Sequence, residues 1–336
     1  MTFFLLPSSI FPQTSLNSSP AKTLINENPS VVTRHASPVT HHYFITFSQS
    51  LYLNTNLPNL ENQNGNYFPK GYGVFSSLLL QYRSRHFTLT AEPRIFDRKQ
   101  YEISIPHKEN EFSVLNDVPL LDIYKQNRFR NTGLKLHFYG ISAGFGNWDQ
   151  WWGPGIHNSL SLSNNAQGFY HYYIGTDGNQ SVGKYVDFSF KYLASRPMQN
   201  LKGDDYFLSA WFLKVKYKFL ELGLNRNVVS GGYPDLPWEQ QDVLTVLIDQ
   251  NNIKYWDTIN TYYILANFEE SGLKVFLEIG FPNRSYAGRD PEVYSDHAMG
   301  SNMGLRKQGA FGSKNLLFGF EYTRLVQGIY YNILPT

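Results

Sequence analysis

Long stretches of this chain alternate between apolar and polar residues with a period of two, and this pattern restricts the fold more than any other feature. The clearest case is residues 206–219, where apolar side chains, interrupted once by a serine, share one face while Lys214, Lys216 and Lys218 share the other. Residues 185–192 separate in the same way. Similar alternation recurs in residues 74–82, 87–91, 134–138, 262–268, 273–279 and 316–322. The sequence therefore predicts an all-β protein whose strands separate an apolar medium from a polar one.

The length of these segments favours a membrane barrel over a soluble domain. Soluble sandwiches, jelly rolls and propellers also alternate, but their strands average about 5 to 6 residues, whereas a tilted strand needs about 9 to 11 to cross a bilayer. Several segments here hold the pattern for the longer distance. We expect about a dozen strands in an antiparallel outer-membrane β-barrel, with a soluble β-domain as the alternative.

Composition agrees with that class and excludes others. The chain has 24 Tyr, 25 Phe and 6 Trp, yet its mean hydropathy is only −0.37, as expected when lipid-facing and lumen-facing residues alternate. No run approaches the roughly 20 apolar residues of a spanning helix. A net charge of +2 without basic clusters argues against nucleic-acid binding. The absence of cysteine excludes disulfides, thiolate metal sites and cysteine nucleophiles.

The chain divides near residue 70. Residues 1–70 are rich in Ser, Asn, Pro and Thr, with one strand-like island at residues 41–47, and we expect a plug, a cap or a lead-in there. Residues 71–336 are expected to form the barrel. Met1–Phe11 carries no positive charge and is interrupted by Pro7, so the sequence shows no clear export signal. Short turns at one end of the barrel and long loops at the other are expected.

The most unusual local segment, residues 147–169, places three tryptophans around a Gly-Pro-Gly turn that leads into a Ser/Asn-rich stretch. Its tryptophans can stack on sugar rings, or they can form an aromatic girdle or a packed turn. Its Ser and Asn side chains can bind sugar hydroxyls, or they can fix a loop inside a barrel. The candidate carbohydrate-binding residues are Trp148, Trp151, Trp152, His157, Asn158, Ser161, Asn164 and Asn165.

Basic residues on the polar faces form a second candidate set. They line the expected lumen, where they either attract acidic solutes and polysaccharides or are ordinary solvated residues: Lys184, Lys191, Lys214, Lys216 and Lys218. A pore for anionic solutes or saccharides is therefore the alternative function. The histidines match no metal-ligand spacing, and the loop carboxylates are expected to face water. We predict no metal, no cofactor and no catalysis.

Residues 151–169, WWGPGIHNSLSLSNNAQGF, resemble the signature of the capsule assembly protein Wzi family in its Bacteroidetes-type members. Lys70-Gly71-Tyr72-Gly73, residues 90–93, residues 128–130 and residues 290–304 add to the resemblance, which covers residue 67 to the C-terminus. The resemblance implies an outer-membrane barrel with an internal plug, acting as a lectin that holds capsular polysaccharide at the cell surface and has no catalytic centre. It implies polysaccharide and outer-membrane lipid as partners of a monomer. Relatives continue through further strands, so the expectations for the barrel of residues 71–336 are a fragment that lacks its last strands, a short member of the family, or an imperfectly closed barrel.

Overall fold

The computed structural model describes residues 2–3, 42–55, 66, 68–101, 129–164, 168–199, 205–231, 257–282, 299–309 and 316–324. These residues fall into two compact units. The first contains described residues of Met1–Leu136, Gly146–Gln150 and Asn164–Phe169. The second contains those of His137–Phe145, Trp151–Ser163 and Tyr170–Thr336. No helix in the described part of the chain has the length and apolar character needed to span a membrane.

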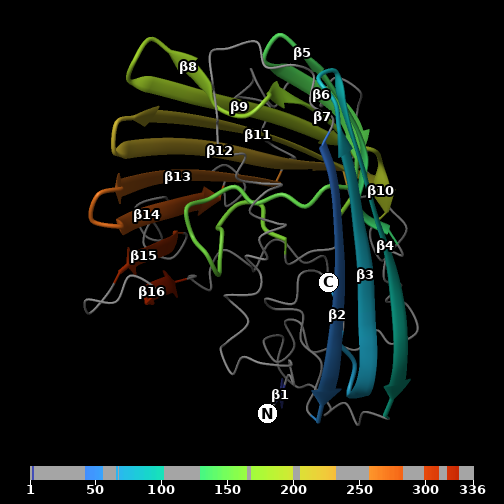
Figure 1. Cartoon of the computed structure of the whole chain (residues 1–336). Helices are drawn as coiled ribbons and strands as arrows, with labels where there is room; N and C mark the ends of the chain where they lie inside the picture. The colour runs from blue at the N-terminus through green and yellow to red at the C-terminus, as the bar shows by residue number, and fades with distance from the viewer. Residues whose placement is uncertain are drawn as a thin grey trace. The chain divides into compact units, whose positions relative to one another are not determined.

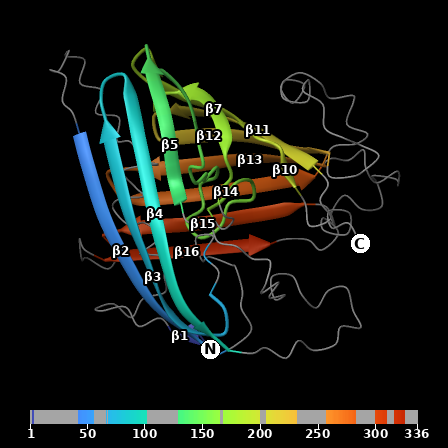
Figure 2. The ribbon, with the colours of Figure 1, turned by 90° about the vertical axis from the view of Figure 1, so that its right-hand side faces the viewer.

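The first unit is an antiparallel sheet of long strands (Figure 2). Its order is β1-β2-β3-β4-β5, and the strands are β1 (Thr2–Phe3), β2 (His42–Asn54), β3 (Gly71–Arg83), β4 (Phe87–Gln100) and residues 129–136 of β5 (Phe129–Phe138). Strand β2 pairs with β3 along its full length, from His42 opposite Arg83 to Asn54 opposite Gly71. It arises from the strand-like island within residues 1–70. The remainder of the expected plug lies largely outside the described residues.

The second unit is also an antiparallel sheet, in the order β6-β7-β9-β11-β12-β13-β14-β15-β16, with β8 on β9 and β10 on β11 (Figure 1). Its strands are β6 (Ile141–Gly146), β7 (His171–Thr176), β8 (Gln180–Val182), β9 (Val186–Ser195), β10 (Met198–Gln199), β11 (Asp205–Tyr217), β12 (Leu220–Gly231), β13 (Asp257–Phe268), β14 (Leu273–Pro282), β15 (Gly300–Gln308) and β16 (Leu317–Arg324). Both units are therefore built from consecutive antiparallel neighbours, as in an up-and-down barrel.

The predicted separation of faces is present in the strands. On β11, Leu213, Val215 and Tyr217 are 37%, 38% and 50% exposed, although all three are apolar or aromatic. The opposite side of the same sheet carries fully buried polar residues, including Thr261 and Glu278. Such a sheet has its apolar side chains on the outside, which suits hydrocarbon rather than water.

Short and long connections alternate along both units. Residues 84–86, 218–219 and 269–272 are short turns, whereas residues 101–128, 147–170 and 232–256 are long connections. In outer-membrane barrels the short turns face the periplasm and the long loops face the cell surface.

Strand β11 ends at Tyr217, before the end of the predicted strand, because Lys218 has a left-handed φ of 51° and belongs to the turn.

Candidate functional site: the loop between β6 and β7

The loop that follows β6 begins with a stem, residues 147–150, in which Asn147 and Asp149 are hydrogen-bonded within the first unit. Asn147, which is 1% exposed, donates from its side-chain amide to Phe129 O at 3.0 Å and accepts from Thr132 N at 2.8 Å. Two residues later, Asp149 receives Arg130 Nε at 2.7 Å and Arg130 Nη2 at 2.6 Å. This bidentate pair is almost fully buried, so its geometry is tightly defined.

An irregularity in the neighbouring strands makes room for this stem. The register of β4 and β5 shifts between Thr90 and Glu92, and Asn131 adopts a left-handed φ of 45°. Asn131 then links Glu92 Oε2 at 2.7 Å to the backbone N–H of Asp149 at 2.8 Å. A β-bulge of this kind redirects side chains locally. Here the irregularity turns the side chain of Asn131 towards the loop.

Beyond the stem, residues 151–163 lie against one face of the second unit. We call this the polar face, and the strand registers place on it Lys191, Phe212, Asn225, Asn227, Thr261, Tyr263, Glu278, Asn302, Glu321 and Thr323. In Figure 1 the loop is the green coil beside β13 and β14.

The carboxylate of Glu321 holds the tip of the loop. It accepts the backbone N–H groups of three consecutive residues, Ile156 at 2.8 Å, His157 at 3.1 Å and Asn158 at 3.0 Å. Successive N–H groups that converge on one anion form a favourable site for negative charge. The tip therefore behaves as an anion receptor whose anion is a strand residue of the same chain.

Two amide side chains complete the contact at the tip. Asn302 donates to Asn158 O at 3.0 Å, and Asn158 in turn donates to Thr323 Oγ1 at 2.9 Å. Gly155 is required at its position because a β-carbon there would overlap the carbonyl oxygen of Asn158 and the amide of Asn302. The Gly-Pro-Gly turn thus serves close packing against β15 and β16.

The middle of the loop is held by residues from β12 and β14. The carbonyl of Trp152 accepts Asn225 Nδ2 at 2.8 Å, and Asn227 Nδ2 donates to Ser161 Oγ at 2.6 Å. Glu278, which is fully buried, accepts Leu160 N at 3.3 Å. Every strand contributor is an amide or a carboxylate, and each engages a different loop residue.

An aromatic stack supports the same region. Trp152 is fully buried and lies 5.8 Å from Phe212, with an interplanar angle of 29°. Phe212 continues the stack onto Tyr263 at 6.5 Å and 18°. Offset stacks of this kind add to the energy of burial itself. Trp152 is therefore the apolar anchor of the loop.

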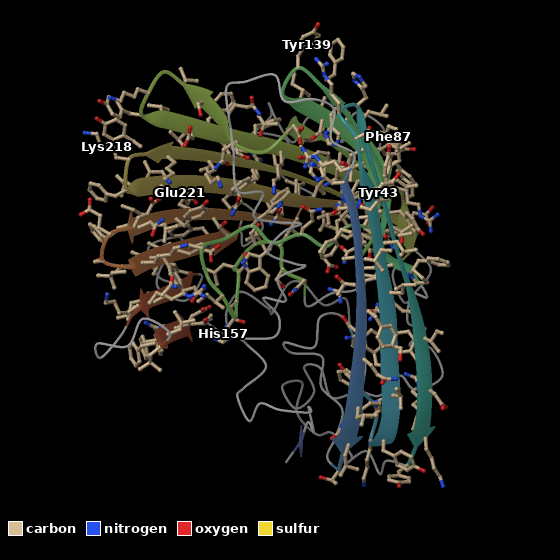
Figure 3. The ribbon with its side chains drawn as sticks, in the orientation of Figure 1. Tyr43, Phe87, Tyr139, His157, Lys218 and Glu221 are labelled. Carbon is tan, nitrogen blue, oxygen red and sulfur yellow. The ribbon has the colours of Figure 1, made fainter. Side chains whose placement is uncertain are left out.

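The structure brings most of the predicted carbohydrate-binding residues into one loop but exposes them unequally. Trp148 is buried in the first unit, with Lys135 Nζ 4.4 Å from its ring centroid. In the second unit Trp152 is buried, whereas Trp151 is half-buried and donates from its indole to Gly155 O at 2.9 Å. The remaining half-buried members are His157, Asn158, Ser161 and Asn164. Asn165 lies outside the described residues. Figure 3 shows His157 on the loop, beside the lower strands of the sheet.

The predicted row of lumen lysines separates into two groups. Lys191, Lys214 and Lys216 are on the polar face, where Lys214 lies 3.8 Å from Glu221 and Lys216 lies 3.5 Å from Glu269. Glu221 also accepts the hydroxyl of Tyr263 at 2.9 Å. Lys184 and Lys218 instead lie in turns. No group of three or more His, Cys, Asp or Glu that can hold a metal is found among the described residues.

Sequence reasoning did not identify the residues that hold the loop. Glu278, Glu321, Asn225 and Asn302 occupy polar-face positions of alternating strands, where polar residues are expected in any barrel. The one available signal was the presence of an isolated carboxylate in the middle of otherwise apolar strands, as with Glu278 in VFLEIGF. Buried carboxylates need hydrogen-bond partners, and that need points to a segment packed on the strand.

One solved structure with a similar fold is an outer-membrane protein. Wzi of Escherichia coli, an outer-membrane protein involved in group 1 capsule assembly and described as a carbohydrate-binding β-barrel, matches with a TM-score of 0.54 and 13% identity. That match covers 97% of this chain and 63% of Wzi, so the chain spans less than two thirds of that relative. OccAB4 of Acinetobacter baumannii has a TM-score of 0.40 at 14% identity, with 86% of this chain and 82% of OccAB4 covered. OprD of Pseudomonas aeruginosa has a TM-score of 0.33 at 12% identity, with 86% and 88% covered. No curated protein matches the sequence.

The family assignment rests on a match over most of the chain. The model of the capsule assembly protein Wzi family matches residues 54–332. The all-β antiparallel fold predicted from the sequence is confirmed in the described residues, and its likeness to Wzi supports the predicted outer-membrane barrel, whereas the plug stays a prediction. The resemblance carried by the tryptophan-rich segment is confirmed as well, and the chain belongs to the capsule assembly protein Wzi family.

Proposed function

We propose that this protein binds capsular or other surface polysaccharide and helps to attach or assemble it at the cell surface. The observation that carries the proposal is the loop of residues 147–164, which lies within the part of the chain that the family model matches and leaves β6 at the end of the strands that bears the long connections. That end faces the cell surface in barrels of this class. Wzi of Escherichia coli, described as carbohydrate-binding, supports the same function.

The proposed sugar contacts are the loop side chains that are not fully buried. Trp151 offers a ring for stacking, and the same loop carries the polar side chains of His157, Asn158 and Ser161. Asn164 and Asn165, which follow in the sequence, are proposed from the sequence pattern alone. Uncharged hydroxyls, amides and aromatic rings are the groups that suit sugar faces and hydroxyls. Trp148 and Trp152 contribute by holding the loop in place, since both are buried.

Binding without catalysis fits the carboxylates of the site. A glycosidase needs two carboxyl groups flanking the bond to be cleaved. Here Glu321 is engaged by three backbone N–H groups and Glu278 is buried beneath Leu160. Both carboxylates hold the loop. The anionic-pore alternative receives less support, because Lys214 and Lys216 have carboxylate partners that offset their charge.

A matched pair of tryptophan variants tests the site. Trp151→Ala is expected to weaken binding of purified capsular polysaccharide by up to about tenfold, since one stacking contact contributes about 0.5 to 1.5 kcal/mol, while leaving thermal stability nearly unchanged. Trp152→Ala is expected to lower stability by about 3 to 5 kcal/mol because it empties a buried site. Polysaccharide affinity is measured by surface plasmon resonance and stability by heat-modifiable gel mobility. Unchanged affinity in Trp151→Ala would remove this residue from the site.

A deletion strain tests the function itself. Cells that lack the gene are expected to release polysaccharide into the medium while making the usual total amount. Complementation with the wild-type gene restores the attached fraction. A deletion strain that keeps all its polysaccharide attached argues against the proposal, and the appearance of new reducing ends on incubation with pure protein argues for an enzyme instead.

A further inference from the structure

We propose that the short-turn end of β9 and β11 carries a binding site for the headgroup of an anionic phospholipid, formed by Lys184, Lys218, Tyr185 and Tyr217. Nothing in the proposed function requires this site. It arises from the two lysines that lie in turns instead of on the polar face.

Both lysines lie close to the same aromatic ring. Lys184 Nζ and Lys218 Nζ each lie 5.3 Å from the ring centroid of Tyr185, and Lys218 Nζ lies 5.3 Å from that of Tyr217. The tyrosine rings pack edge to face at 6.4 Å and 71°. Two ammonium groups that share one ring present a concentrated positive charge to whatever lies beside that ring.

The turn that carries Lys218 is held in a defined shape. Lys218 has a φ of 51°, an unusual value for a residue with a side chain, and its N–H donates to Tyr185 O at 3.3 Å. Next to it, Phe219 stacks on Phe268 at 5.2 Å and 20°. Figure 3 shows Lys218 at the outer edge of the sheet, at the turn end of the strands. The two lysines therefore lie beside a group of packed aromatic rings, Tyr185, Tyr217 and Phe219, which we call the aromatic platform.

This platform continues the apolar side of the sheet. Tyr217 follows Leu213 and Val215 on the exposed face of β11, and Tyr185, Tyr217 and Phe219 are each about half exposed. Tyrosines at the end of an apolar strand face lie at the level of lipid headgroups. Within the described chain, the nearby lysines Lys214 and Lys216 have carboxylate partners, whereas Lys184 and Lys218 contact rings. A phosphate complements this charge.

The position of the site along the strands indicates which class of lipid it contacts. The turns of β8–β9 and β11–β12 are short connections, and short turns face the periplasm in this class of barrel. The adjacent leaflet consists of phospholipid. We therefore assign the site to an anionic phospholipid of the periplasmic leaflet, such as phosphatidylglycerol, and not to lipopolysaccharide.

Native mass spectrometry of the full chain in uncharged detergent tests the assignment. Phosphatidylglycerol is expected to bind at least tenfold more tightly than phosphatidylethanolamine, lipopolysaccharide or inorganic phosphate. Equal affinity for both phospholipids, or a preference for lipopolysaccharide, overturns the proposal. This comparison uses the unmodified protein and so does not depend on how variants fold.

Variants then locate the site. Each lysine near a membrane surface strengthens attraction to anionic lipid about fivefold, so Lys184→Gln with Lys218→Gln is expected to weaken phosphatidylglycerol binding roughly 30-fold. The matched control is Lys99→Gln, an exposed lysine near the end of β4 that leads into a long connection. An unchanged affinity in the double variant, or an equal loss in the control, overturns the assignment to these residues.

Discussion

The stem and the tip of the loop between β6 and β7 are held by different kinds of contact. The stem depends on the side chains of its own residues, above all on Asp149, which pairs with Arg130. The tip depends on one strand carboxylate, Glu321, that accepts N–H groups from the loop backbone. The stem is therefore sensitive to the identity of its loop residues, whereas the tip is sensitive to the strand and to backbone shape.

The largest expected effect comes from breaking the stem. Asp149→Ala leaves the Arg130 guanidinium buried without its carboxylate, and loss of one partner of a buried pair costs about 3 to 5 kcal/mol. Urea unfolding in phospholipid vesicles measures the loss. The double variant Arg130→Met with Asp149→Leu is the control, since removing both charges is expected to recover much of the stability. A loss below about 1 kcal/mol in the single variant would show that the pair is not sealed from water.

An intermediate effect is expected at the tip. Glu321→Gln keeps the side-chain size but removes the charge and replaces one acceptor oxygen, so it weakens hydrogen bonds worth about 1 to 3 kcal/mol. Amide hydrogen exchange at residues 156–158 is expected to accelerate roughly tenfold or more, with little change in global unfolding.

His157→Ala sharpens the comparison at the tip. Its backbone N–H remains available to Glu321, so exchange at residues 156–158 is expected to stay near the wild-type rate. Fast exchange in this variant would mean that the histidine side chain also holds the loop.

The smallest effect is expected away from the loop. Lys216→Gln removes an ion pair whose glutamate partner is 74% exposed, and such pairs contribute less than about 1 kcal/mol. Lys214→Gln is expected to have the larger effect, because Glu221 is more buried and also binds Tyr263. Unfolding midpoints of the two variants, measured side by side, test this order. A larger loss in Lys216→Gln would reverse it.

The periodic part of the fold was predictable because the environment imposes it on every strand. On strand β11, Leu213, Val215 and Tyr217 lie on the apolar side, and Lys214 and Lys216 lie on the opposite side. The local sequence alone predicts this alternation, without knowledge of contacts to distant parts of the chain. Strand ends were less accurate, as at Lys218, where a turn replaces the last predicted strand position.

The attachment of the loop was not predictable because its partners lie far away in sequence. Glu321 is separated from the amides that it binds by more than 160 residues. A polar residue on the polar face of a barrel strand looks the same whether it meets water or a loop. The tryptophan-rich segment signalled the family correctly. Its pattern did not reveal that Trp152 is buried against Phe212 while Trp151 remains partly accessible.

The capture of three successive backbone N–H groups by Glu321 separates the position of the loop tip from the chemistry of its side chains. Residues 156 and 157 contribute only main-chain atoms to this clasp, so substitution there changes what the tip presents without loosening it. Backbone contacts of this kind allow the side chains at residues 156 and 157 to vary while the loop keeps its position, as the constant scaffold of an antibody does for its variable loops. Libraries randomised at these two positions are expected to fold as the parent does and, under the proposed function, to differ in the polysaccharides that they bind.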